Sequence, residues 1–241
     1  MHPKIRRNLA KIIYRETTFA THFNVPIKFD QREIKAVNER IIETPFIFSS
    51  IESDNNPKKI LDFGCTRSWI SLSLASLGHN VYGIDIRDFP FQHPNFIFKK
   101  GNILDFEIRN FDYIISLSTL EHVGLGAYGE EYDHQAFFKV IHKINWLLKP
   151  DGRFILTLPV GRPSSDQFEK SFSPNEILDL ILTRGFYLVK ENYFRRFDYI
   201  YWSPCSKEEI AGVSNDLQAR KKGGSGVNGV GCYIFQKSHP E

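Results

Sequence analysis

From residue 58 onward, short apolar segments alternate with segments of helical periodicity, and this alternation constrains the fold more than any other feature. Alternating strands and helices form βαβ units, whose strands lie mostly parallel in one sheet with helices on both faces. We therefore predict an α/β three-layer sandwich with a mostly parallel, seven-stranded sheet. The predicted strands are residues 59–63, 80–86, 95–99, 111–117, 153–158, 186–194 and 231–237.

Helices are predicted between several of these strands, at residues 69–77, 133–148 and 173–184. Ser68 and Gly78 flank the first of them, and serine and glycine favour the beginning and the end of a helix respectively. Ligands of parallel sheets bind at the carboxyl ends of the strands. The turns that follow the strands are therefore where we expect the functional residues.

Residues 1–57 have a different pattern and are predicted to form a helical N-terminal cap on a single domain of residues 1–241. A helical stretch runs over residues 31–43, and Pro45 is expected to stop it. We expect the basic start of the cap to cover the ligand site, and contact with a membrane surface is the alternative. Residues 203–230 separate the last two strands and are predicted to be a substrate-side insertion.

The composition argues against several classes of protein. The chain has 31 Lys and Arg against 28 Asp and Glu, without the clustered basic charge of a dedicated nucleic-acid-binding protein, so nucleic acid is not the expected partner. No run of about 18 apolar residues predicts a transmembrane helix. The three cysteines lie far apart, so neither a disulfide framework nor a zinc site is indicated. With no secretory signal at the basic N-terminus, we expect a cytoplasmic protein.

Acidic residues lie at the ends of the first two predicted strands. Asp62 precedes Gly64 in a turn between a strand and a helix, and glycine lets the backbone approach a ligand closely. Asp85 ends the second strand, where a carboxylate can accept two hydrogen bonds from a ribose diol. The two turns are therefore predicted to line one nucleotide site.

The first of these turns resembles that of the class I S-adenosylmethionine-dependent methyltransferases. The family has an acidic residue followed by G-x-G-x-G. Here Asp62 and Gly64 keep the pattern, while Thr66 and Ser68 replace the second and third glycines. Both replacements are small, so the turn can still close on the amino-acid moiety of the cofactor. The resemblance spans residues 58–160 and implies a Rossmann-like sheet with S-adenosylmethionine as the cofactor.

Later segments extend this resemblance. Asp85 matches the ribose-binding acid of the family, and Asn102 stands where the family commonly has an aspartate that contacts adenine. Residues 116–123 (SLSTLEHV) look like the stretch after the fourth strand of small-molecule methyltransferases, and residues 147–152 (LLKPDG) look like the turn before the fifth. The run over residues 121–161 also resembles an uncharacterised branch, the DUF268 type.

The resemblance implies roles for individual residues. Cofactor contacts are expected from Asp62, Gly64, Cys65, Thr66, Ser68, Asp85, Ile86, Gly101, Asn102, Ile103, Ser116 and Leu117. The candidates for catalysis are His122, Glu121 and Tyr128, and His122 is preferred as the base that takes the proton of a hydroxyl acceptor. No metal is expected, because Ser118 replaces one acid of the E-x-x-E-H motif of metal-dependent members.

We therefore expect a methyltransferase that acts on a small-molecule or glycan- or lipid-type acceptor, at oxygen. The main alternative is a non-catalytic methyltransferase-fold protein that serves as a binding or scaffold subunit. The altered glycine turn supports this alternative, and the retention of Asp62, Gly64 and Asp85 opposes it. A nicotinamide-dependent reductase is disfavoured because no G-x-G-x-x-G follows the first strand. The near-neutral charge disfavours RNA methylation.

Overall fold

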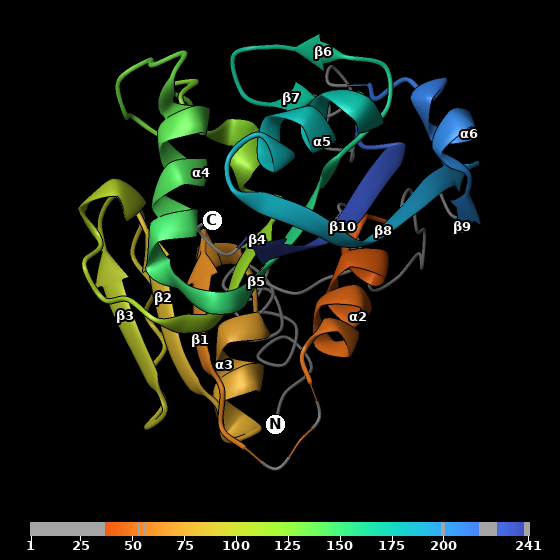
Figure 1. The fold of residues 1–241 in the computed structure, drawn as a ribbon. Coiled ribbons are helices and arrows are strands. Elements are labelled where there is room, and N and C mark those ends of the chain that lie inside the picture. Colours follow the sequence, from red (N-terminus) through yellow and green to blue (C-terminus); the bar gives the residue numbers. More distant parts are fainter. Residues whose placement is uncertain (1–36, 53, 55, 199–200, 217–225, 239–241) are drawn as a thin grey trace, which may run out of the picture.

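An eight-stranded mixed sheet runs through the molecule, with helices on both faces (Figure 1). The computed structural model describes residues 37–52, 54, 56–198, 201–216 and 226–238. The strands of the sheet are β1 (Lys59–Phe63), β2 (Asn80–Asp85), β3 (Phe96–Lys100), β4 (Phe111–Leu117), β5 (Leu148–Pro159), β8 (Phe186–Phe197), β9 (Tyr201–Cys205) and β10 (Gly229–Lys237). Their order is β3-β2-β1-β4-β5-β10-β8-β9.

The sheet is mostly parallel, as predicted. Strands β1 to β5 pair in parallel, and β10 runs antiparallel to both of its neighbours, β5 and β8. All seven predicted strands form, and β9 adds an eighth strand that pairs antiparallel with β8 at the edge. Pro204 lies within β9, and proline is tolerated in an edge strand because the outer side of that strand needs no hydrogen-bond donor.

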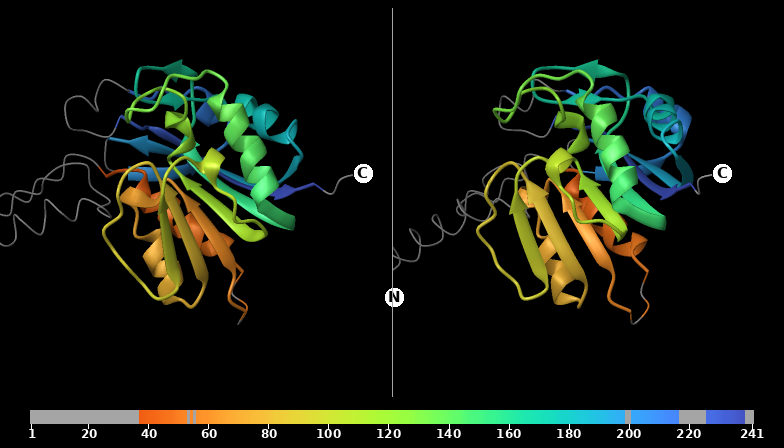
Figure 2. Two further views of the ribbon diagram at one scale, coloured as in Figure 1. Left: turned by 90° about the vertical axis from the view of Figure 1, so that its left-hand side faces the viewer. Right: turned by 60° about the vertical axis from the view of Figure 1, so that its left-hand side comes forward.

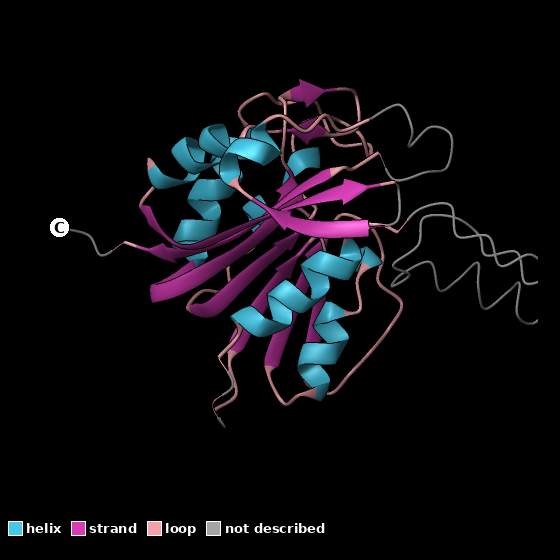
Figure 3. Cartoon of the chain, turned by 90° about the vertical axis from the view of Figure 1, so that its right-hand side faces the viewer, coloured by secondary structure: helices cyan, strands magenta, loops and turns pink. Residues whose placement is uncertain are grey.

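Two layers of helices cover the sheet (Figures 2 and 3). The helices are α2 (Arg40–Ser50), α3 (Ile70–Ser76), α4 (Ala136–Leu147), α5 (Pro174–Leu182) and α6 (Lys207–Ala211). Apolar residues of α4, α5 and α6 form one buried cluster with one face of the sheet, and those of α2 and α3 form a second cluster with the other face. The core therefore lies in two layers, as in an α/β sandwich.

The predicted helices agree with α3, α4 and α5, and the last of these begins with a capping box. The Ser173 side chain accepts a hydrogen bond from the Glu176 N–H, and the Glu176 side chain accepts one from the Ser173 N–H. Pro174 follows as the first helical residue, where its missing N–H has no consequence.

Pro45 does not end a helix, so that prediction is wrong. It lies inside α2, which continues to Ser50. The proline removes one backbone hydrogen bond. The turn that follows is held by Phe46 and Ile47, which are buried against the sheet, and packing of this kind stabilises helices more than intrinsic propensity does. The earlier part of the predicted cap, residues 1–36, lies outside the described residues.

Several short elements complete the fold. Strands β6 (Ser164–Ser165) and β7 (Lys170–Ser171) form a separate hairpin, and the 3-10 helices are η1 (Cys65–Arg67), η2 (Ile103–Asp105) and η3 (Leu120–His122). The predicted turn at residues 149–152 is an irregularity within β5, where Asp151 has a φ of 59°. None of the helices in the described ranges has the length and apolarity needed to cross a membrane.

Candidate functional site

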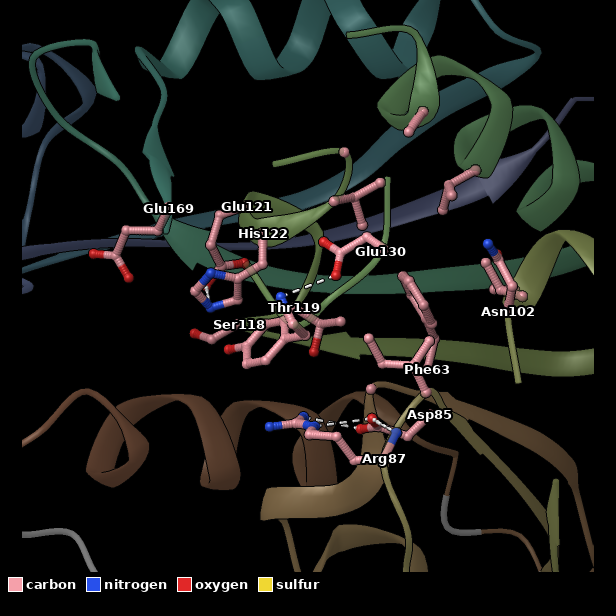
Figure 4. Close-up of a pocket in the computed structure, with 18 of the residues that line it drawn as sticks. Phe63, Asp85, Arg87, Asn102, Ser118, Thr119, Glu121, His122, Glu130 and Glu169 are labelled. Carbon is pink, nitrogen blue, oxygen red and sulfur yellow. Dashed lines mark hydrogen bonds and ion pairs between the residues drawn. The ribbon is translucent and has the colours of Figure 1, made fainter. Parts of the chain in front are cut away.

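A cavity of about 850 Å³ opens at the carboxyl ends of β1, β2 and β4 (Figure 4). This is the edge of the sheet at which the sequence predicts a ligand, next to the point where the strand order reverses between β1 and β4. The volume falls within the range of about 300–1,000 Å³ that is usual for small-molecule and cofactor sites. Figure 4 shows Asn102 on one side of the cavity and Glu169 on the other, with the ends of β1 and β2 below.

The turn after β1 comes very close to the segment that follows β4. Gly64 has a φ of 81°, and a Cβ atom at this position would clash with the Thr119 side chain. Glycine is therefore required both by the backbone conformation and by the close approach. Ser68 lines the cavity and its Oγ accepts a hydrogen bond from the Ile70 N–H, at 3.0 Å, at the start of α3.

Asp62 lies beneath this turn, and its carboxylate is 1% exposed. The Ser71 hydroxyl donates to Oδ2 at 2.6 Å, whereas Oδ1 has no hydrogen-bond partner among the described residues. The pKa of Asp62 is raised to about 6, mainly by burial and also by the nearby Asp85, against the lowering effect of the Ser71 hydrogen bond. A buried oxygen without a partner is uncommon in folded proteins and carries a cost.

Asp85 is held by four hydrogen bonds. The Arg87 side chain donates from Nε to Oδ1 and from Nη2 to Oδ2, both at 3.0 Å. The backbone N–H groups of Arg87 and Thr66 donate at 2.9 and 3.0 Å. Burial favours a raised pKa for Asp85, but these hydrogen bonds outweigh burial and hold the pKa below its usual range. The oxygens predicted to bind a ribose diol are therefore engaged by Arg87.

Arg87 also links Asp85 to the loop after η3. Its guanidinium carbon lies 4.7 Å from the centre of the Tyr128 ring, an attractive arrangement for a cation and an aromatic face. The Glu130 side chain accepts a hydrogen bond from the Tyr128 N–H at 2.9 Å. The pair of Arg87 and Tyr128 thus bridges the cavity between β2 and this loop.

The remaining predicted cofactor contacts that line the cavity come from three strand ends. Gly101, Asn102 and Ile103 follow β3, and the Asn102 Oδ1 accepts a hydrogen bond from the Leu104 N–H at 3.0 Å, which caps η2. Ile86 follows Asp85 and presents an exposed apolar side chain. Leu117 ends β4. Polar and apolar surfaces therefore alternate along this side of the cavity.

The three residues predicted to be catalytic meet at the other side. A ring nitrogen of His122, Nδ1, lies 2.6 Å from the Phe168 carbonyl oxygen. Because a carbonyl oxygen only accepts, Nδ1 carries the hydrogen, and Nε2 is the basic nitrogen of the neutral ring. Tyr128 and Phe168 pack edge-on against His122, with ring centres 5.6 and 4.8 Å away. The Glu121 Oε1 lies 3.8 Å from His122 Nε2.

Four of the predicted cofactor contacts do not line the cavity. Asp62 is buried below it, and Thr66 takes part through its backbone N–H to Asp85. Ser116 is buried in the sheet. Cys65 packs in the apolar cluster beneath the turn, next to Gly83, and burial raises the pKa of its thiol far above the usual range. The cysteine therefore fills space in the core.

The residues contributed by α2 and by the β6–β7 hairpin were not predicted from the sequence. Glu43 of α2 is fully buried, pairs with Arg40, and accepts a hydrogen bond from the Ser118 hydroxyl at 2.5 Å. Phe168 and Glu169 reach the cavity from the hairpin. An acidic residue between the apolar pairs Ile41–Ile42 and Phe46–Ile47 was a usable signal for Glu43, but the sequence has no comparable signal for the hairpin.

No group of side chains in the described ranges has the composition and geometry of a metal site. The Glu121 and His122 pair would be two ligands of such a site, and Ser118 occupies the third position of the motif. Ser118 instead donates its hydroxyl hydrogen to Glu43.

Comparisons with known proteins agree with this architecture. No curated protein matches the chain. A family model described as "Caenorhabditis protein of unknown function, DUF268" matches residues 98–200. A 1,6-didemethyltoxoflavin N1-methyltransferase of Burkholderia thailandensis, 16% identical, has a TM-score of 0.54 over 76% of this chain and 72% of its own.

Two further solved structures have the same fold. An S-adenosylmethionine-dependent methyltransferase of Methanosarcina mazei is 18% identical, with a TM-score of 0.57 over 81% of this chain and 98% of its own. The N-methyltransferase NodS of Bradyrhizobium japonicum is 14% identical, with a TM-score of 0.52 over 83% and 88%. The protein therefore has the fold of the class I S-adenosylmethionine-dependent methyltransferases, and its residues 98–200 match the DUF268 family.

Proposed function

We propose that the protein transfers a methyl group from S-adenosylmethionine to a small-molecule acceptor of glycan or lipid type, at a hydroxyl oxygen. The observation that carries the proposal is one cavity that brings the Gly64 turn, Asp85 and Asn102 together with His122. Two of the similar structures, the toxoflavin-pathway enzyme and NodS, contain S-adenosylhomocysteine. The proposal keeps the expected cytoplasmic location and single-domain organisation.

The described residues fit this cofactor. Ile86 and Ile103 offer apolar surface for a flat ring, and Asn102 lies beside them. Asp85 supplies the carboxylate for ribose hydroxyls. Asp62 precedes the glycine turn, and its buried Oδ1 has no hydrogen-bond partner among the described residues. S-adenosylmethionine supplies a methyl group already activated by a positive sulfur, so the protein mainly has to align donor and acceptor.

The Arg87 side chain competes with ribose for Asp85, which leads to a testable prediction. Arg87→Ala removes the two side-chain hydrogen bonds to Asp85 and keeps the two backbone ones. We therefore expect S-adenosylhomocysteine to bind on the order of tenfold more tightly, since the charge-assisted hydrogen bonds of the Arg87 side chain no longer have to be broken. Isothermal titration calorimetry of the two proteins measures the difference. Weaker binding by the variant would mean that Arg87 contacts the cofactor instead of blocking its site.

We propose His122 as the base. Its Nδ1–H is fixed by the Phe168 carbonyl, which orients Nε2 toward Glu121 at the edge of the cavity. A base of this kind takes the proton of a hydroxyl acceptor as the carbon–oxygen bond forms. We predict that His122→Ala lowers kcat by about 10²–10⁴-fold and leaves the affinity for S-adenosylhomocysteine nearly unchanged. Equal losses of affinity and of kcat would assign His122 to cofactor binding.

The activity itself is tested by release of S-adenosylhomocysteine from S-adenosylmethionine in the presence of a panel of hydroxyl and amine compounds. We expect at least one acceptor to raise the release above the solvent background, and Asp85→Ala to abolish the increase. If the protein binds S-adenosylmethionine but releases no S-adenosylhomocysteine with any compound of a wide panel, the proposal of a small-molecule acceptor is contradicted.

A second candidate function has one observation in its favour. The Arg87 side chain hydrogen-bonds to both oxygens of Asp85, and Thr66 and Ser68 replace two glycines of the family's turn. A methyltransferase fold that serves only as a scaffold subunit would show both features. In that case Arg87→Ala would not create measurable cofactor affinity. The calorimetric experiment on Arg87 therefore separates the two functions as well.

A further inference from the structure

The hydrogen-bonding capacity of the Asp85 carboxylate is fully used (Figure 4). Oδ1 accepts from the backbone N–H and the Nε of Arg87, and Oδ2 accepts from the Thr66 N–H and from Arg87 Nη2. A carboxylate oxygen accepts about two hydrogen bonds, so neither oxygen has a lone pair left for a ligand. The two backbone donors are fixed by the fold, whereas the Arg87 side chain is 31% exposed. A ribose that binds Asp85 must therefore displace the Arg87 side chain.

The same arginine contacts a loop that borders the other side of the cavity. Residues 124–133 connect η3 to α4, and we call them the 124–133 loop. Its base is closed, because the Asp133 N–H donates to the Gly124 carbonyl oxygen at 3.0 Å. Gly124 has a φ of 80°, and a Cβ atom there would clash with the Asp133 carbonyl oxygen. Loops of this length with closed ends are compact units, so the tip can move while η3 and α4 stay in place.

Tyr128 at the tip of this loop contacts both sides of the cavity. Its ring packs against His122 and Phe168, with ring centres 5.6 and 5.3 Å away. These two contacts join the loop to the side of the proposed base. The stack on the Arg87 guanidinium, at 4.7 Å, joins it instead to the end of β2. The position of the loop tip therefore depends on the side chain that a ribose has to displace.

From this arrangement we infer that Arg87 couples the two sides of the cavity, so that binding of the cofactor to Asp85 releases the tip of the 124–133 loop. The inference rests on the proposed function and adds an order of events to it: the loop beside the acceptor becomes free after the cofactor has bound. A ligand shifts a conformational equilibrium only if its affinities for the two states differ. Here they differ because Asp85 has no lone pair for ribose while Arg87 is in place.

The coupling is reciprocal, and this makes it measurable from the loop as well as from the carboxylate. If the cofactor loosens the loop, a change that loosens the contact of the loop with Arg87 must strengthen cofactor binding by the same factor. An ion pair that is merely structural has no such consequence. Cofactor affinity should then be independent of Tyr128.

The first test is a double-mutant cycle, in which calorimetry measures the binding of S-adenosylhomocysteine to the full chain. Tyr128→Leu keeps apolar bulk beside His122 and removes the ring face that attracts Arg87. We expect it to bind S-adenosylhomocysteine about two- to fivefold more tightly, as for the loss of one cation–π contact. In the Arg87→Ala background the same substitution should have no effect, because the contact is already absent. Weaker binding by Tyr128→Leu, or an equal effect in both backgrounds, would overturn the inference.

Two further variants show whether the ring face is responsible. Tyr128→Phe keeps the ring and removes only its hydroxyl, so its affinity for S-adenosylhomocysteine should equal that of the unmodified protein. Tyr132→Leu makes the same substitution as Tyr128→Leu at a tyrosine of the same loop that is 71% exposed, and it should also leave the affinity unchanged. A gain in Tyr132→Leu as large as that in Tyr128→Leu would trace the effect to the loop in general and contradict the role of Arg87.

The second test follows the loop itself by amide hydrogen exchange and needs no variant that has to fold. The Tyr128 and Gly129 N–H groups are hydrogen-bonded within the tip, and the Asp133 N–H is bonded at the base. Saturating S-adenosylhomocysteine should speed exchange at the two tip amides by about two- to fivefold and leave the Asp133 amide unchanged. Slower exchange at the tip would show that the cofactor holds the loop, which is the opposite of the inference.

These measurements separate the inference from the proposed function. Absence of S-adenosylhomocysteine binding in every protein of the cycle contradicts the proposed function and the coupling with it. Binding with additive effects in the cycle and unchanged exchange at the tip overturns the coupling alone, and the proposed function then stands.

Discussion

Asp85→Ala is expected to weaken the binding of S-adenosylhomocysteine by at least about 100-fold and to leave the fold intact. The proposed role of Asp85 is to accept two hydrogen bonds from the ribose hydroxyls, and a hydrogen bond to a charged group contributes about 1.5–3 kcal/mol. Calorimetry measures the affinity, and circular dichroism at increasing temperature monitors the fold. Arg87 retains its contact with Tyr128 in this variant.

Two controls accompany this prediction. Asp88→Ala removes an exposed carboxylate three positions further along, which pairs with Lys100, and should leave the affinity unchanged. Asp85→Asn keeps one acceptor oxygen, and its affinity for S-adenosylhomocysteine should lie between those of Asp85→Ala and Asp88→Ala. If Asp85→Ala binds the cofactor as well as the unmodified protein, the ribose role of Asp85 is wrong.

Asp62→Asn is expected to stabilise the protein above pH 6. The pKa of Asp62 is raised to about 6 in the folded protein, against about 3.9 in an unfolded chain. The Asp62 carboxyl group therefore stays protonated in the native state over a pH range in which it is ionised in the unfolded state. The stability contributed by Asp62 is present at low pH and is lost as the pH rises from about 4 to about 6. Asparagine does not titrate and can still accept the Ser71 hydrogen bond.

The size of this effect follows from the shift in pKa. Two units correspond to up to about 3 kcal/mol, or several degrees in the melting temperature of a chain of this length. Thermal unfolding at pH 4, 6 and 8 measures it, and the gain should be absent at pH 4. Asp179→Asn, on the exposed face of α5, is the matched control for the same substitution at an exposed position. A lower melting temperature for Asp62→Asn at pH 8 would show that the ionised carboxylate supports the fold.

This prediction also connects stability with function. A carboxylate that is buried, raised in pKa and left with an unpartnered oxygen lowers the stability of the free protein. Residues of this kind are retained where a ligand needs them. We therefore expect the stabilised Asp62→Asn variant to bind the cofactor less tightly.

The parts of the fold that could be predicted from the sequence depend on local patterns. The strands are short apolar runs with polar ends, and Ser173 with Pro174 predicts the start of α5. Asp62 and Asp85 were recognisable because they lie at the ends of buried strands, and the sheet topology then brings the turns that follow them to one edge. These features are determined by residues that lie close together in the sequence, so they can be predicted from it.

The features that could not be predicted depend on contacts between distant segments. Pro45 is compatible with α2 because Phe46 and Ile47 pack on the sheet. The hairpin that carries Glu169 has no strong pattern of its own, since each of its strands has two residues. Arg87 is close to Asp85 in the sequence, but its contact with Tyr128 joins it to a loop that lies far away in the sequence.

The central claim is that the cavity at the ends of β1, β2 and β4 binds S-adenosylmethionine. It is tested most directly by thermal unfolding of the full chain with S-adenosylmethionine, S-adenosylhomocysteine or NADPH. A ligand at about 100 times its Kd stabilises the folded state by about 2.7 kcal/mol, which corresponds to a rise of roughly 5–10 °C for a chain of this length. The account predicts this rise with both S-adenosyl compounds and none with NADPH. No rise with either S-adenosyl compound, or a rise with NADPH alone, would contradict it.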